Sequence, residues 1–290
     1  MKLSVIIPTC DRISLLERAI TSVQCQFIDS DISGFTDIDI VIVNDGVNVT
    51  NKDIVNICEN FNNFKVKVIK NTGLHSAASA RNLGVRHCNG DYVTFLDDDD
   101  QYLNGRLNSM IKFHLKNIGV YSFISSGRIG DVNDLSEIVS FKKQRFGIVL
   151  EKDIKYKNDI DIGFLIEKKL FLIKGGFPTD MKAYEDWSLI LRLLEDKPGY
   201  KICRLDYLVN IDNERERVSD NEFDCCETLA RKHGDRYGDK WINYIINFGL
   251  YKSGRMYFIS TLRSFFLFYD FFILKWYFFG CLKKMRNIFS

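Results

Sequence analysis

The stretch from Tyr92 to Asp100 constrains this chain most, because a short apolar run leads directly into four consecutive carboxylates. Apolar and β-branched residues in so short a run predict a strand buried on both faces of a parallel sheet. Ligands of such sheets bind beyond the carboxyl ends of the strands. Adjacent carboxylates repel one another, and a divalent cation that accepts oxygen ligands, such as Mg²⁺ or Mn²⁺, relieves the repulsion. Most acidic runs are solvated loops. This acidic run directly follows a hydrophobic strand, and that position favours a metal site.

The overall composition describes a globular chain without a strong attraction to nucleic acid. Its 290 residues have room for one large domain or two modest ones, and 46% of them are hydrophobic. The formal net charge is only +2, so the overall electrostatic field of the protein does not attract nucleic acid. Eight cysteines without Cys-x-x-Cys spacing and four histidines without a ligand-spaced pair predict reduced thiols and no zinc site. The apolar segment before Pro8 is too short for a secretory signal, so we expect a cytoplasmic protein.

Segments with strand and helix patterns alternate through the first half of the chain. This alternation with short connections predicts right-handed βαβ units. Residues 127–160 are polar, charged and weakly periodic, and we interpret them as a variable excursion over the site, a candidate lid. The expected strands are 3–8, 39–43, 65–70, 92–96, 120–125 and 161–166, and the expected helices are 15–23 with a Ser14 cap, about 52–62, 81–85, 106–117 and 168–174.

Polar residues follow three of these strands, and the carboxyl ends of parallel strands meet at one edge of a sheet. The three groups are Thr9–Asp11, Asn44–Gly46 and Asp97–Asp100. A bound nucleotide explains acids at all three places. Asp45 would accept from a base N–H, Asp97 or Asp98 from ribose hydroxyls, and Asp99 would hold a metal on the diphosphate.

Two further segments carry residue types that suit chemistry. Arg81 suits a cation beside phosphate or base, although a solvated helical arginine explains it equally well. Glu185 and Asp186 fall in the first turn of an amphipathic helix after a Gly-Gly loop, where acids also simply compensate the helix dipole. With Trp187 beside them, they favour a catalytic base and a stacking platform for a sugar.

The C-terminal tail differs in character from the rest of the chain. Residues 258–279 are rich in Phe, Tyr and Trp but include Arg263, Asp270 and Lys275, which interrupt any clean transmembrane span. The basic run Lys283–Arg286 follows. An aromatic-rich helix with basic flanks suits the membrane interface and anionic lipids. The alternative is a helix packed on the catalytic domain or on a dimer partner.

Taken in order, the motifs resemble an inverting glycosyltransferase of family 2 with the GT-A fold. The resemblance covers about residues 3–195 and implies a nucleotide-diphospho-sugar transferase fold, an α/β Rossmann-like mixed sheet flanked by helices with a C-terminal helical tail. It places a catalytic domain at 1–217, with a nucleotide half to about 100 and an acceptor half from 101, and a helical region at 218–290. The matching pieces are Val5–Thr9 with Arg12, Val43–Gly46, Asn71 with Gly73, Ala80–Asn82 with Gly84, Gly90–Tyr92, Phe95–Asp100, Gly175–Phe177 and Glu185–Trp187.

The resemblance also implies roles for individual residues. Asp186 would be the catalytic base, supported by Glu185. Asp97 and Asp99 form an Asp-x-Asp element that binds Mn²⁺ or Mg²⁺, and Trp187 and Gly176 would contact the acceptor. Residues 212–219 lack the histidine that the family often carries near there, so no phosphate or metal contact is assigned to them. The nucleotide-sugar would contact Pro8, Thr9, Asp11, Arg12, Asp45, Arg81, Asp97 and Asp98.

The implied activity is transfer of a hexose, with inversion, from a UDP-sugar to a GlcNAc- or GalNAc-diphospho-lipid in O-antigen or other surface-polysaccharide (lipopolysaccharide) synthesis. UDP-glucose or UDP-galactose is the donor expected first, and the protein would work peripherally on the inner face of a bacterial plasma membrane, with a homodimer left open. Two rival classes remain. A nucleotidyltransferase usually begins with a Gly-rich loop, which residues 1–25 lack. A non-catalytic nucleotide-sugar-binding protein would keep the Asp run and could dispense with Glu185 and Asp186.

Overall fold

The computed structural model describes residues 1–29, 32, 34–132, 137–141, 144–211 and 222–289, with side chains described as far as 282. Contacts divide the chain into two units. The first comprises Met1–Thr179 and Leu189–Glu214, and the second comprises Asp180–Ser188 and Arg215–Ser290. The segment 180–188 thus groups with the C-terminal helices. The domain boundary expected at 217 stays a prediction, and the expectation for residues 212–219 falls outside the described residues.

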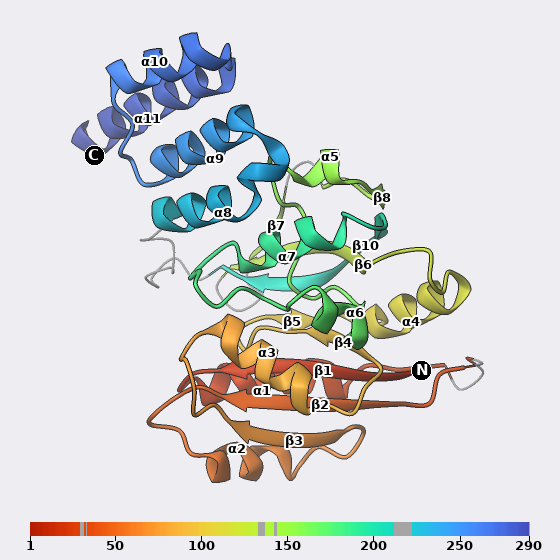
Figure 1. The fold of residues 1–290 in the computed structure, drawn as a ribbon. Coiled ribbons are helices and arrows are strands. Elements are labelled where there is room, and N and C mark those ends of the chain that lie inside the picture. Colours follow the sequence, from red (N-terminus) through yellow and green to blue (C-terminus); the bar gives the residue numbers. More distant parts are fainter. Residues whose placement is uncertain (30–31, 33, 133–136, 142–143, 212–221, 290) are drawn as a thin grey trace. The chain divides into compact units, whose positions relative to one another are not determined.

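The first unit contains a five-stranded sheet with the order β3-β2-β1-β4-β9 (Figure 1). β1 pairs in parallel with β2 and β4, β2 pairs in parallel with β3, and β9 pairs antiparallel with β4. The predicted βαβ alternation is therefore confirmed, and all four parallel strands end at one edge. The strands are β1 Lys2–Thr9, β2 Asp37–Asn44, β3 Lys65–Lys70, β4 Tyr92–Phe95 and β9 Ile166–Glu167.

Successive side chains of β1 point to opposite sides of this sheet. Both faces are therefore apolar at β1, and helices cover each of them. Val5 and Ile7 pack in the core cluster that includes Leu16 and Ile20 of α1. Ile6 points the other way, toward α3, where a Cβ on Gly84 would overlap its side chain. Glycine at position 84 therefore lets α3 lie close to the sheet. The helices are α1 Ile13–Gln24, α2 Asn51–Cys58 and α3 Ala77–His87.

The start of α1 differs from the sequence prediction. The helix begins at Ile13, so Ser14 lies inside its first turn and the predicted Ser14 cap is wrong. Arg12 occupies the N-cap position without a capping side-chain hydrogen bond, and its guanidinium instead contacts Asp98 and Asp99. The side chain at the N-cap position therefore pairs with the acidic run instead of capping the helix.

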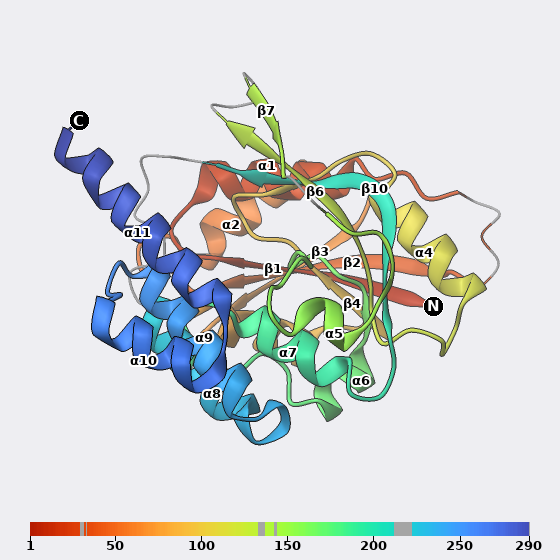
Figure 2. The same cartoon turned by 90° about the horizontal axis from the view of Figure 1, so that it is seen from above.

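A second sheet has the order β5-β10-β6-β7, with β8 also paired to β10. β6 and β10 run parallel, side by side (Figure 2). The weak periodicity of residues 127–160 did not predict the elements found there, since β6 continues to Val132 and further short elements follow. The expected excursion over the site stays a prediction. Edge strands of three or four half-exposed residues carry too little apolar periodicity to be recognised. The elements are β5 Gln101–Tyr102, α4 Arg106–Lys116, β6 Ile124–Val132, β7 Glu137–Ser140, β8 Gly147–Val149, α5 Glu151–Ile154, α6 Lys168–Ile173, α7 Glu185–Leu193 and β10 Gly199–Asn210.

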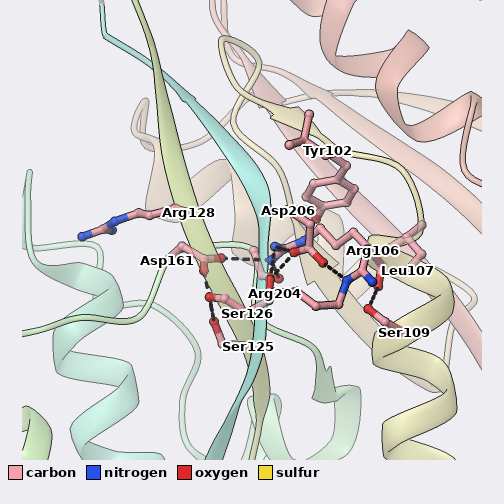
Figure 3. Close-up of polar contacts among 12 residues, drawn as sticks. Tyr102, Arg106, Leu107, Ser109, Ser125, Ser126, Arg128, Asp161, Arg204 and Asp206 are labelled. Carbon is pink, nitrogen blue, oxygen red and sulfur yellow. Dashed lines mark hydrogen bonds and ion pairs between the residues drawn. The ribbon is translucent and has the colours of Figure 1, made fainter. Parts of the chain in front are cut away.

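A fully buried arginine joins the elements around this second sheet (Figure 3). The Arg106 guanidinium lies 2.8 Å from an Asp206 oxygen and 3.0 Å from an Asp161 oxygen. It also stacks at 4.9 Å on the ring centroids of Tyr102 and Tyr207. Charges so far from water are tolerated only when they are paired and hydrogen-bonded, as here.

Replacing Arg106 with methionine is expected to destabilise the protein by about 3–5 kcal/mol, because it removes the buried cation from Asp161 and leaves Asp206 with only the partly exposed Arg204. Arg204→Met is the matched control. Arg204 donates to the same Asp206 at 2.9 Å, but its side chain is 43% exposed, so we expect a loss of about 0–1 kcal/mol. Urea unfolding of both variants measures the difference, and equal midpoints would contradict the structural role of Arg106.

The second unit is helical and rich in aromatic residues. Its C-terminal helices are α8 Glu222–Tyr237, α9 Asp239–Lys252, α10 Phe258–Phe268 and α11 Phe271–Phe289, and α10 and α11 lie side by side (Figures 1 and 2). α8 and α9 approach closely, since a Cβ on Gly249 would lie 2.8 Å from that of Cys226. All eight cysteines are free in the structure, and their redox state in the cell stays a prediction. None of the helices in the described part of the chain combines the length and hydropathy needed to span a bilayer.

Candidate active site

The carboxyl edge of the first sheet gathers the polar residues that the sequence predicted there. β1 ends at Thr9, β2 at Asn44 and β4 at Phe95, just before the acidic run. Pro8 lies inside β1, opposite Val43 of β2. Because these strands run parallel, the residues that follow them share one edge, and the predicted juxtaposition is confirmed for Thr9 and the Asp run.

Asp98 lies at the centre of this edge and is completely buried. Thr9 Oγ1 donates to its carboxylate at 2.7 Å, and Arg12 Nε donates at 3.1 Å. A second nitrogen of Arg12 lies 3.0 Å from Asp99. Burial raises the pKa of Asp98 to about 6, although Arg12 and Thr9 favour its ionised form. Arg12 thus pairs with two of the four neighbouring carboxylates and offsets part of their charge.

The other carboxylates of the run form a compact group of oxygen donors. Asp97, Asp99 and Asp100 each bring an oxygen within 4.8 Å of the others. The Asp100 side chain accepts from the backbone N–H of Asn210 on β10 at 2.9 Å. Burial, and then repulsion from Asp97 and Asp99, raises the pKa of Asp100 well above its ordinary value. Several carboxylates at this spacing fit the oxygen-ligand preference of Mg²⁺ or Mn²⁺.

The sequence prediction named Asp97 and Asp99 as metal ligands and left Asp100 out. Its adjacency in the run was the available signal, but its inward orientation depends on β10, more than a hundred residues away. Arg81, on α3, is nearly buried and pairs with Asp97. Its guanidinium carbon also lies 5.6 Å from the ring centroid of Phe177. Arg81 therefore lies beside the metal-binding candidates, where its predicted nucleotide contact stays a prediction.

Asp45, predicted to bind the nucleotide base, contacts two side chains from the loop between β3 and α3. Asn71 Nδ2 donates to Asp45 Oδ1 at 2.6 Å, and His75 Nδ1 lies 2.9 Å from the same oxygen. The prediction did not assign a site role to either residue. Asn71 was recognisable within its motif, whereas nothing in the sequence linked His75 to Asp45. Together they fix the orientation of the Asp45 carboxylate.

Asp11 has a structural task in addition to its predicted nucleotide contact. Its backbone adopts φ 55°, in the left-handed region, and its carboxylate accepts from the backbone N–H groups of Val47, Asn48 and Val49 at 2.8–3.1 Å. These hydrogen bonds, with that from Val49 the largest cause, lower the pKa of Asp11. The residue thereby anchors the loop between β2 and α2.

Replacing Gly46 with alanine is expected to disturb this loop. A Cβ at position 46 would overlap the Asp11 carboxylate, so we expect a loss of about 1–3 kcal/mol from overpacking together with weaker UDP binding. Gly73→Ala is the control, since its Cβ would meet only an Asn71 oxygen at 3.6 Å. Thermal unfolding and calorimetry with UDP measure both effects, and an unchanged Gly46→Ala protein would refute the steric argument.

The Gly175-Gly176 turn, predicted to end a helix and to contact the acceptor, is attached to α3. Gly176 has φ +63° and a Cβ there would lie 2.5 Å from Asn82 Oδ1. Asn82 accepts from the backbone N–H of Phe177 at 2.9 Å and donates to its carbonyl at 2.7 Å. The turn is therefore tied to the helix that carries Arg81. The acceptor contact of Gly176 stays a prediction.

Glu185, Asp186 and Trp187 begin α7, so their predicted place in the first turn of a helix is confirmed. All three belong to the second unit. The Trp187 backbone N–H donates to Asp186 Oδ1 at 2.7 Å. The Trp187 indole is only 2% exposed and packs among aromatic neighbours, which is unlike a platform open to a sugar. The catalytic and acceptor roles of the three residues stay predictions.

The model of the family described as glycosyl transferase family 2 matches residues 4–172 of the chain, more than half of its length. The chain belongs to glycosyl transferase family 2. The predicted family is thereby confirmed, and with it the predicted class of enzyme, a glycosyltransferase. The matched region contains the strand edge and every carboxylate of the acidic run.

Curated relatives of this family 2 chain include several bacterial proteins. It is 34% identical over 112 residues to the Campylobacter jejuni GalNAc(5)-diNAcBac-PP-undecaprenol beta-1,3-glucosyltransferase, covering 38% of this chain and 34% of that one. It is 27% identical over 257 residues to the uncharacterized glycosyltransferase YwdF of Bacillus subtilis, covering 81% and 85%. An uncharacterized Rickettsia bellii glycosyltransferase matches at 30% identity, but the chain spans only 19% of its length.

Solved structures confirm the predicted GT-A fold. S. aureus TarS 1-349 in complex with UDP-GlcNAc superimposes with a TM-score of 0.67 at 16% identity, covering 97% of this chain and 79% of that one. The mannosyltransferase PcManGT from Pyrobaculum calidifontis, in complex with GDP-Man and Mn²⁺, gives 0.62 at 15% identity, covering 98% and 80%. At these identities the likeness concerns the fold.

Proposed function

We propose that this family 2 glycosyltransferase transfers a hexose, with inversion, from a UDP-sugar to a lipid-diphosphate-linked GlcNAc or GalNAc acceptor. The observation that carries the proposal is the cluster of Asp97, Asp99 and Asp100 at the sheet edge, beside the Thr9–Asp98–Arg12 contacts. The TarS neighbour was solved with UDP and with UDP-GlcNAc, which supports a uridine nucleotide as the donor.

In this proposal the first unit binds the donor. Asp45, oriented by Asn71 and His75, accepts from the N–H of the base, and Thr9, Asp98 and Arg81 contact the nucleoside. Asp99 and Asp97 would hold a divalent cation, with Asp100 completing the oxygen set. When bound, such a cation neutralises charge that develops on the leaving diphosphate. The Mn²⁺ in the PcManGT structure supports a metal of this kind.

Asp186 is proposed as the general base. It removes the proton from an acceptor hydroxyl, whose oxygen attacks the anomeric carbon as the bond to the diphosphate breaks. One base without a nucleophilic carboxylate gives a single displacement, so an α-linked donor yields a β-linked product. Glu185 would support the base or contact the acceptor.

The acceptor class rests on the relatives. The Campylobacter jejuni relative is named for a PP-undecaprenol substrate, and an Escherichia coli relative, 24% identical over 243 residues, is named a putative colanic acid biosynthesis glycosyl transferase. Both names support surface-polysaccharide synthesis on a lipid carrier, with glucose or galactose tested first.

Release of UDP from UDP-glucose and UDP-galactose, with and without GlcNAc-diphospho-undecaprenol and its GalNAc counterpart, tests the proposed activity. We expect rapid UDP release only when a matching donor, an acceptor and Mn²⁺ are all present. UDP binding without release under any of these combinations would favour a non-catalytic binding protein, and release of pyrophosphate from UTP and a sugar phosphate would favour a nucleotidyltransferase.

We further propose that the aromatic tail attaches the enzyme peripherally to the cytoplasmic face of the plasma membrane. Deleting residues 258–290 is then expected to move most of the protein from the membrane fraction to the soluble fraction, because the deletion removes the exposed aromatic side chains and the basic residues together. Fractionation followed by immunoblotting measures this shift. Retention of the truncated protein on membranes would contradict the proposed attachment.

A further inference from the structure

The second unit contains both the segment with Asp186 and the helices with the aromatic tail. We propose that binding of an anionic lipid surface to α10 and α11 orders the segment around Asp186 through a continuous row of aromatic side chains. The inference rests on the proposed function, since it assumes the roles given there to Asp186 and to the tail. It adds a regulatory link between membrane attachment and the catalytic segment.

The row begins immediately beside Asp186. The buried Trp187 indole packs edge-on against Tyr184 and Phe248, with ring centroids 5.8 and 6.5 Å apart. The next residue along α7 contacts α8, since Ser188 Oγ lies 2.9 Å from His233 Nε2 and both groups are buried. The residues that follow Asp186 are therefore held by α8 and α9.

The backbone just before α7 depends on the same aromatic contacts. Tyr184 has φ 65°, a left-handed conformation that bulky side chains rarely adopt. Such conformations persist only where the surroundings fix them, and they cluster at functional segments. The Tyr184 ring lies 6.3 Å from Phe248 and 5.8 Å from Trp187. The position of Phe248 therefore influences the entry to the helix that carries Asp186.

From Phe248 the row continues to the tail. The Phe248 ring, on α9, lies 5.6 Å from Trp276 of α11. Trp276 also contacts Tyr244 at 4.8 Å and stacks on Tyr251 at 6.0 Å. Three rings in sequence, Trp187, Phe248 and Trp276, thus connect the start of α7 to α11.

The tail helices present an exposed apolar surface of the kind that marks an interaction site. Its most exposed members include Ile259, Phe266, Leu267, Phe271, Phe272 and Phe278, at 58–81% exposure. Residues 257–290 contain five basic residues against one acidic residue, Asp270. Because two copies of so basic a segment repel each other, the charge favours an anionic lipid surface over a second copy of this chain.

Lipid that immobilises α11 also restricts Trp276, and through Phe248 it restricts Trp187 and Tyr184. A ligand that rigidifies one part of a packed unit reduces local opening elsewhere in that unit. The consequence is a catalytic segment that is best ordered when the enzyme is on the membrane, where a lipid-linked acceptor resides.

Amide hydrogen exchange of the full-length chain tests this link, with vesicles of phosphatidylglycerol and phosphatidylcholine in equal parts. We expect exchange in residues 185–193 and in 258–279 to slow by about threefold to tenfold. Vesicles of phosphatidylcholine alone should leave both segments unchanged. Phe271→Ser, at a side chain 72% exposed, should weaken the response of both segments to the anionic vesicles.

Phe248→Leu separates the two halves of the inference, because it removes the central ring but keeps an apolar side chain. We expect this variant to retain slowed exchange in 258–279 and to lose it in 185–193, and Trp276→Leu provides a second break. Slowing in 258–279 of the natural chain without slowing in 185–193 would overturn the coupling and leave membrane attachment intact. Absence of co-sedimentation with anionic vesicles would overturn attachment and coupling together, while UDP release tests glycosyl transfer separately.

Discussion

Replacing Asp99 with asparagine should remove the Mn²⁺ dependence of UDP binding and lower turnover by about 10²–10³-fold, the usual effect of deleting one electrostatic contact to a charge that develops on the leaving group. Asp99 contributes to a group of three carboxylates within 4.8 Å, and asparagine keeps its size while removing its charge. Calorimetry with UDP, with and without Mn²⁺, measures the binding effect, and UDP release measures turnover.

Asp91→Asn is the matched control for Asp99→Asn. Asp91 precedes β4, at the opposite end of the strand from the acidic run, and its carboxylate accepts from the backbone N–H of Lys2 at 3.3 Å. We expect this variant to bind UDP and Mn²⁺ as the natural chain does. If Asp99→Asn kept its metal-dependent affinity, the metal would have to be held elsewhere.

Replacing Asp186 with asparagine should lower turnover by about 10²–10⁴-fold, the typical contribution of a general base, while donor binding stays unchanged. The predicted effect is confined to proton removal, because the residues proposed to bind the donor all lie in the first unit and Asp186 lies in the second. Single-turnover measurements with saturating donor and acceptor separate the chemical step from binding.

The control for Asp186 is Asp180→Asn, in the same unit. The Asp180 carboxylate pairs with Lys232 at 2.8 Å on the surface, so its loss should change stability slightly and turnover little. Normal turnover in Asp186→Asn would exclude it as the base and would direct attention to Glu185.

The sequence predicted β1, β2 and β4 of the first sheet because these strands are buried on both faces and read as apolar runs. β3 is partly exposed and alternates lysine with apolar residues, a pattern that also predicts a strand. β3 was predicted from residue 65 to residue 70, as the structure has it. The second sheet was largely missed. β7 and β8 are edge strands of three or four residues. β7 pairs with β6, which precedes it in the chain, whereas β8 pairs with β10, which begins fifty residues after β8 ends.

The residues of the candidate site also fall into those that the sequence predicted and those that it did not. Thr9, Asp98 and Asp99 were predictable because each follows a recognisable strand. Asp100, His75 and the structural task of Asp11 were not, because each depends on a contact with a segment that no local pattern specifies. The grouping of residues 180–188 with the C-terminal helices was equally hidden, since the helical pattern of α7 continues without interruption into the first unit.

The buried Arg106 also sets rules for recombining this enzyme with its relatives. Its two partner acids stand 55 and 100 positions downstream, so a chimera joined between residues 110 and 160 would inherit the cation from one parent and the acids from another. Crossovers placed before α4 keep the trio in one parental block. Acceptor preference could then be exchanged between family members without dismantling the interior of the second sheet.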